Sequence, residues 1–119
     1  KLYNDCSPMP YTNKENDLGN MPLVQFFEAL RGIMQLCLSR LKNNRYMVVF
    51  CKDFQPQPGE PNMLHADIVR ELCKIDGLVY RGMRIWHDQA MSLYPFGYPY
   101  AFVMNQIHQY ILIFRKEVE

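Results

Sequence analysis

With 119 residues, the chain has the length of one domain, residues 1–119, and can bury a single hydrophobic core. Apolar residues at 49% and charged residues at 21% exclude a disordered or fibrous protein. The formal net charge of +1 excludes a general electrostatic attraction to phosphate, so any contact with nucleic acid needs a local basic patch.

The first half of the chain predicts a helix followed by a strand. Asn20 can cap the helix, and Pro22 fits its first turn because the amide that proline lacks has no partner there. Apolar residues recur at steps of three and four from Leu23 to Leu41, as on one face of a helix. Asn43-Asn44 can end this helix, since asparagine tolerates the left-handed conformation. The continuously apolar run from Tyr46 to Cys51 predicts a strand buried on both faces.

The second half predicts a loop, a helix and two strands. Three prolines between Gln55 and Pro61 exclude regular structure, and a helix is expected from about Asn62 to Ile75. A strand is expected within Leu78 to Trp86 and another at Tyr110 to Arg115, with irregular chain over Asp88 to Asn105. Strands that alternate with helices indicate an α/β layered fold with a partly parallel sheet.

The sequence indicates neither a metal site nor a disulfide framework. It contains no Cys-x-x-Cys pair, and its three histidines are too scattered for a metal-binding motif. Three of the four cysteines, Cys37, Cys51 and Cys73, lie in apolar runs that predict reduced, buried thiols. The apolar runs are too short to span a bilayer, and no signal segment opens the chain, so a cytoplasmic protein is expected.

Three motifs occur in order along almost the whole chain. They are the turn Ser7-Pro8-Met9-Pro10-Tyr11, the pair Ile85-Trp86, and the block from His108 through Tyr110-Ile111-Leu112-Ile113-Phe114 to Arg115-Lys116. This set resembles the DNA methyltransferases that modify the exocyclic amine of adenine (N6) or cytosine (N4). The resemblance implies part of a Rossmann-like layered sheet with helices, as in S-adenosylmethionine-dependent methyltransferases. It also implies a last strand that is antiparallel and lies between its two predecessors.

The proline-aromatic turn is the expected catalytic segment. In the family, a polar residue, two prolines and an aromatic ring hold the amine of a base that has been swung out of the helix. Tyr11 matches the stacking ring and Pro10 the proline before it. With Met9 as an insertion, Ser7 and Pro8 match the polar residue and the first proline, whereas without a gap Pro8 takes the polar position. The resemblance therefore assigns the catalytic role to Ser7, Pro8, Pro10 and Tyr11.

The DNA-binding residues implied by the resemblance lie in the last third of the chain. They are Trp86, Asn105, His108, Arg115 and Lys116. Asn105 and His108 match an Asn-x-x-His pattern near the target base, although a hydrogen-bonded structural histidine is the alternative for His108. Asp88 stands where the family often has a lysine. The alternative interpretation of the basic groups near the sheet is that they are ordinary solvated surface.

The cofactor of the family, S-adenosylmethionine, is bound by an aromatic-x-Gly-x-Gly loop that this chain lacks. The nearest two of its six glycines, Gly77 and Gly82, are five positions apart. The cofactor-binding residues therefore stay unknown, and we expect a chain that is incomplete or inactive on its own. A glycine-rich loop elsewhere in the parent gene would favour a catalytic half.

The alternative function is a non-catalytic remnant that self-associates or binds nucleic acid. A half-sheet without its usual neighbours leaves backbone groups at an open edge, which favours a homodimer joined there or through bare faces. Aromatic residues around Tyr94 to Phe102 would suit single-stranded nucleic acid.

Overall fold

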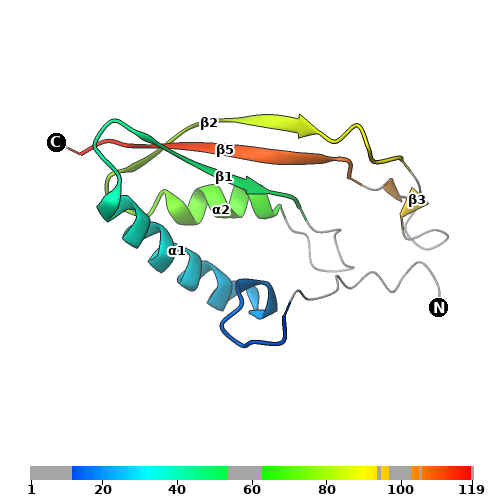
Figure 1. Cartoon of the computed structure of the whole chain (residues 1–119), viewed down its shortest axis with the longest axis horizontal. Coiled ribbons are helices and arrows are strands. Elements are labelled where there is room, and N and C mark those ends of the chain that lie inside the picture. The colour runs from blue at the N-terminus through cyan, green and yellow to red at the C-terminus, as the bar shows by residue number, and fades with distance from the viewer. Residues whose placement is uncertain (1–11, 54–62, 94, 97–102, 105, 119) are drawn as a thin grey trace.

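The computed structural model describes residues 12–53, 63–93, 95–96, 103–104 and 106–118, and it contains a small α/β fold (Figure 1). Its main sheet has the strand order β1-β5-β2, where β1 is Tyr46–Cys51, β5 is His108–Lys116 and β2 is Leu78–His87. The strand β5 pairs antiparallel with both neighbours. The expectation that the last strand lies antiparallel between its two predecessors is therefore confirmed.

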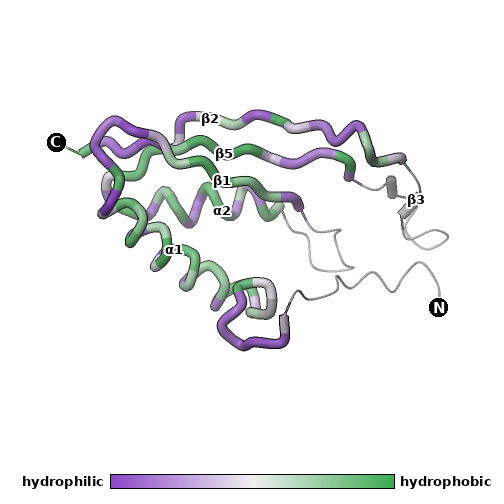
Figure 2. The backbone as a smooth tube through the Cα atoms, in the orientation of Figure 1, coloured by the Kyte–Doolittle hydropathy of each residue, from purple (hydrophilic) through white to green (hydrophobic). Residues whose placement is uncertain are grey.

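Two helices cover one face of this sheet (Figure 1). They are α1, Leu23–Arg40, and α2, Leu64–Leu72, and both were expected from the apolar periodicity. Among the described residues, nine buried core residues come from both helices, the turn after α2, and strands β2 and β5. The fully buried ones are Leu72, Leu112 and Phe114. Figure 2 shows hydrophobic residues along α1 and along the sheet strands.

The start of α1 differs from the expectation. Residue 20 ends a short 3-10 helix, η1, Leu18–Asn20, which the Asp17 carboxylate caps by accepting from the amide of Gly19. Pro22 then occupies the cap position of α1, and its carbonyl accepts the first helical bond from the amide of Phe26 at 2.8 Å. The prediction that Asn20 caps α1 is wrong because the 3-10 turn intervenes.

The other end of α1 is held by the last strand. The ammonium group of Lys116 donates to the carbonyl oxygens of Leu38 and Leu41, at 2.7 and 2.8 Å. These are carbonyls that a helix end leaves without an internal partner, and a cation there also opposes the helix dipole. Asn44 has the expected left-handed conformation, with φ of 63°, but it lies in the turn before β1, after the helix has ended.

Three sequence expectations are corrected by the sheet. The prediction that β1 is buried on both faces is wrong, because the helices cover one face and leave Tyr46, Val48 and Phe50 exposed. The prediction of a partly parallel sheet is wrong for the described strands: β1 and β2 run in the same direction, but β5 separates them. Two of the cysteines expected to be buried, Cys37 and Cys73, are exposed.

The segment expected to be irregular contains a short antiparallel ladder. It joins β3, Pro95–Phe96, to β4, Val103–Met104. The second helix is shorter than expected, because a turn follows Leu72 and leads to Gly77, whose φ of 88° suits glycine. Among the described residues, no helix combines the length and the apolar character needed to cross a bilayer.

Candidate functional site

The carboxyl ends of β1 and β2 meet at one end of the sheet, where β5 begins. The register pairs Cys51 with Tyr110 and His87 with His108. In open α/β sheets, ligands bind in the region beyond the carboxyl ends of the strands. The polar and aromatic residues at this end are therefore the best candidates for chemistry. We call Asp53, His65, His108 and Tyr110 the sheet-end cluster.

Asp53 and His65 form the central contact of the sheet-end cluster. Asp53 lies two residues beyond β1, and His65 is the second residue of α2. The Nδ1 atom of His65 lies 2.9 and 2.8 Å from the two carboxylate oxygens, and the backbone amide of His65 donates to Oδ1 at 2.9 Å. The carboxylate thus caps α2, whose own cap residue, Met63, makes no side-chain bond to the helix. The side chains of Asp53 and His65 are only 9% and 13% exposed, respectively.

Two further rings fix the orientation of the imidazole. The ring of His65 stacks on Tyr110 with centroids 3.8 Å apart and an interplanar angle of 10°. His108 meets the same tyrosine edge-on at 5.0 Å. Because a carboxylate can only accept, Nδ1 of His65 carries a proton and donates it. Among the described residues, Nε2 of His65 has no hydrogen-bond partner.

Two weakly acidic groups near Asp53, the thiol of Cys51 and the hydroxyl of Tyr110, remain protonated at neutral pH. Burial, and then the charge of Asp53, raises the pKa of the Cys51 thiol to about 11. Burial also raises the pKa of Tyr110, and the charges of Asp53 and Cys51 add to this effect. A thiol of this kind is a poor nucleophile, since the thiolate is the reactive form. The Tyr110 hydroxyl remains a potential hydrogen-bond donor.

In this arrangement the carboxylate of Asp53 orients the imidazole of His65. A side chain that donates or accepts a proton in catalysis needs such an orientation. Such a role needs a substrate atom near Nε2 of His65. A metal role has no support from the geometry: in the described part of the chain, no group of three or more histidine, cysteine, aspartate or glutamate side chains could hold an ion.

The DNA-binding residues expected from the sequence are divided between the two ends of the sheet. Trp86, 49% exposed, and His108 lie at the end with the sheet-end cluster. Arg115 and Lys116 lie at the other end, about 23 Å away along an extended strand. Arg115 pairs with Glu117 at 3.3 Å and lies over the ring of Tyr46. Together with the bonds of Lys116 to α1, these contacts give both cations structural roles.

The expected catalytic turn, Ser7, Pro8, Pro10 and Tyr11, lies outside the described residues, as does Asn105. The structure therefore does not place these residues relative to the sheet-end cluster. Conversely, sequence reasoning missed the contact between Asp53 and His65. The only available signal was a carboxylate just beyond a strand and a histidine at the start of the next helix.

Comparison with known proteins adds no further assignment to this site. The sheet-end cluster rests on the geometry alone, and the motifs rest on the sequence alone. No family model, curated protein or solved structure matches the chain.

Proposed function

We propose that the chain is the catalytic half of an amino-directed DNA methyltransferase with a Rossmann-like layered fold. The reaction is methyl transfer from S-adenosylmethionine to the exocyclic amine of adenine or cytosine. The observation that carries the proposal is the strand order β1-β5-β2, with an antiparallel central strand that comes last in the chain. The resemblance implies this central position of β5, whereas apolar periodicity does not. The strand order therefore supports the family assignment separately from the match in helices and strands.

The roles follow the motif order. Ser7, Pro8, Pro10 and Tyr11 hold the amine and stack on the extruded base, and Trp86, Asn105 and His108 lie toward the DNA. Arg115 and Lys116 contribute less to DNA binding than the motif alone implies, because Glu117 and the end of α1 engage them. A DNA substrate and reduced cysteines suit a cytoplasmic location.

The residues present do not fit a cradle for S-adenosylmethionine. Such a cradle needs glycines in a loop between the carboxyl end of a strand and a helix, where the backbone can approach the ligand. The four described glycines lie in η1, in α1, between α2 and β2, and within β2. The cofactor would have to be held by a separate glycine-loop unit.

DNA binding by the chain tests the proposed base-extruding role. A duplex with one mismatched adenine or cytosine should bind more tightly than the matched duplex, because less unpairing energy is needed. The change Tyr11→Ala should weaken binding of the mismatched duplex about tenfold, the loss of one stacked ring. Fluorescence anisotropy at fixed salt measures both affinities, and Tyr3→Ala serves as the control. Equal binding of matched and mismatched duplexes by the unmodified chain would contradict the proposal.

We expect the chain alone not to bind S-adenosylmethionine tightly, because it offers no glycine loop. Isothermal calorimetry should give no saturable heat at micromolar concentrations of the cofactor. A saturable micromolar signal would place the cofactor site within residues 1–119 and overturn this expectation.

The alternative function is a non-catalytic module that self-associates or binds nucleic acid. The exposed apolar side chains on the helix-free face of the sheet favour it, because a catalytic half needs no such surface for chemistry. A module that binds nucleic acid through this face would show no mismatch preference that depends on Tyr11, so the same DNA experiment separates the two functions.

A further inference from the structure

The strand β1 is an open edge within the described sheet. It pairs with β5 on one side and with no described strand on the other. All six of its residues, Tyr46–Cys51, are uncharged, none is proline, and its register with β5 runs without a bulge. Charges, prolines and bulges are the usual devices that keep an edge strand from pairing further. The backbone of β1 is thus suited to accept another strand.

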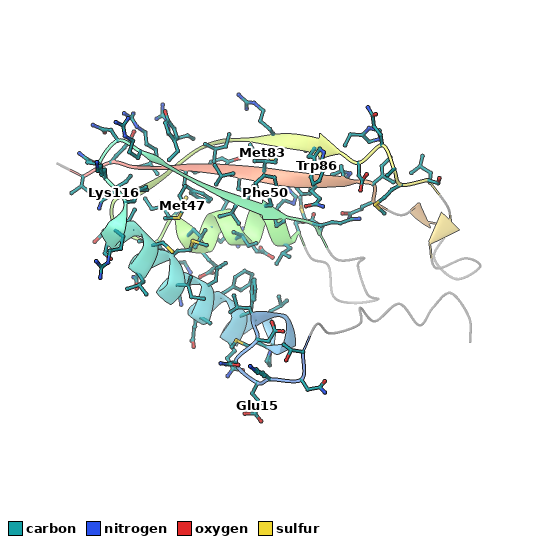
Figure 3. The ribbon with its side chains drawn as sticks, in the orientation of Figure 1. Glu15, Met47, Phe50, Met83, Trp86 and Lys116 are labelled. Carbon is teal, nitrogen blue, oxygen red and sulfur yellow. The ribbon has the colours of Figure 1, made fainter. Side chains whose placement is uncertain are left out.

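A shallow, open apolar groove of about 590 Å³ lies between the second half of α1 and the start of β1. Its lining residues are Leu36, Cys37, Arg40, Leu41, Tyr46 and Met47. Among these lining residues, Leu36 is 67% exposed. Met47 lies on the helix-facing side of β1 (Figure 3). A strand added at the edge would bring alternate side chains to this groove.

The charge around the groove is positive. Of the described residues that line it, Arg40 is the only charged one, and Lys42 and Arg45 follow in the connection to β1. All three are exposed, and none of them forms an ion pair with another described residue. The complement to this surface is therefore an acidic segment.

A second copy of the chain fits the edge poorly. An antiparallel pairing about a two-fold axis midway between Val48 and Val49 would place Arg45 of one copy opposite Lys52 of the other. Like charges opposite one another disfavour strand pairing. An extended peptide with acidic residues at one end has no such conflict.

We propose that the β1 edge and the adjacent groove bind an extended peptide segment by strand addition. Its backbone pairs with β1, its alternate apolar side chains enter the groove beside Leu36 and Met47, and its acidic end lies against Arg40 and Arg45. Backbone bonds supply affinity in this mode of recognition, and the groove supplies specificity.

Anisotropy with a labelled peptide of alternating valine and threonine, ending in several glutamates, tests the site. The change Leu36→Asp should weaken binding at least about tenfold. The matched control Val24→Asp, at another exposed apolar position of α1, should leave affinity within about twofold. Arg40→Glu should weaken the glutamate peptide and strengthen a lysine-ended version, whereas Arg70→Glu on α2 should do neither.

Three results would overturn the proposal. One is failure of the glutamate peptide to bind the unmodified chain. Another is equal loss of binding in Leu36→Asp and Val24→Asp. The third is a dimer that Leu36→Asp converts to a monomer, because a second copy would then be the occupant of the groove. Circular dichroism of each variant shows whether the helices remain, so that unfolding is not read as lost binding.

Discussion

Replacing Asp53 with alanine is expected to lower the free energy of unfolding by about 2–4 kcal/mol. The carboxylate accepts from the backbone amide of His65 and from its Nδ1 atom, at 2.8–2.9 Å. Loss of a helix cap costs about 1 kcal/mol, and loss of a hydrogen bond to a charged group costs about 1.5–3 kcal/mol. The imidazole would also keep a donor with no acceptor while only 13% exposed.

Asp67→Ala is the matched control, because Asp67 is the aspartate that lies within the first turn of α2 itself. It lies near the same helix terminus, and its expected contribution through the helix dipole is only about 0.3–1 kcal/mol. Asp53→Asn retains an oxygen that can accept from the amide and should give an intermediate loss. Urea unfolding followed by far-ultraviolet circular dichroism measures all three. Equal losses for Asp53→Ala and Asp67→Ala would show that the contact with His65 contributes little.

The secondary structure and the strand order could be predicted because they depend on signals along the chain. The helix α1 has an apolar stripe over most of its length, and β1 and β5 are runs rich in β-branched and aromatic residues. Apolar periodicity does not reveal which strands are neighbours. The expectation that β5 lies between β1 and β2 came from the resemblance of the motif order to that of the methyltransferases.

Burial could not be predicted from the same signals. A continuous apolar run such as Tyr46–Cys51 is typical of a strand covered on both faces, but coverage depends on how many helical layers the chain supplies. The described helices lie on one face only, so every second residue of β1 remains exposed. Cys37 is exposed although the periodicity places it on the apolar stripe of α1, because the next residue, Leu38, is the one that faces the core.

The candidate site was hidden for a geometric reason. Asp53 and His65 are twelve residues apart, and neither belongs to a motif with a fixed spacing. Their contact requires α2 to begin beside the end of β1. The stacking of His65 on Tyr110 also requires the register that pairs Cys51 with Tyr110. Only the tertiary structure brings these three segments together.

The helix-free face of the sheet is expected to join two copies of the chain. On this face the register places Tyr46, Val48 and Phe50 of β1 beside Ile111 and Ile113 of β5, with Trp86 of β2 beyond them. The aromatic side chains are about half exposed, at 57%, 57% and 49% for Tyr46, Phe50 and Trp86, respectively. With their aliphatic neighbours they form an exposed apolar surface, and a large surface of this kind on a monomer often marks an interaction site.

A homodimer through this face should be visible as a particle of about twice the chain mass of 14.2 kDa in light scattering at micromolar concentration. A stable interface buries about 800 Å² on each partner, so polar residues around the apolar patch must supply the remaining area. Packing two sheets face to face leaves the β1 edge open, and of the residues that line the groove only Tyr46 belongs to the dimer face. The dimer and the proposed peptide site can therefore exist together.

Phe50→Lys is expected to abolish the dimer, because it places a charge at the centre of the buried patch, where desolvation without a partner is costly. Met63→Lys is the matched control, since Met63 is also 57% exposed but precedes α2 on the helix side of the sheet. Sedimentation or light scattering over a concentration series should show a monomer for the first variant and a dimer for the second. A monomeric unmodified chain throughout that series would reject the dimer. Equal dimerisation of both variants would instead place the contact on another surface, with the aromatic residues of β1 left in solvent.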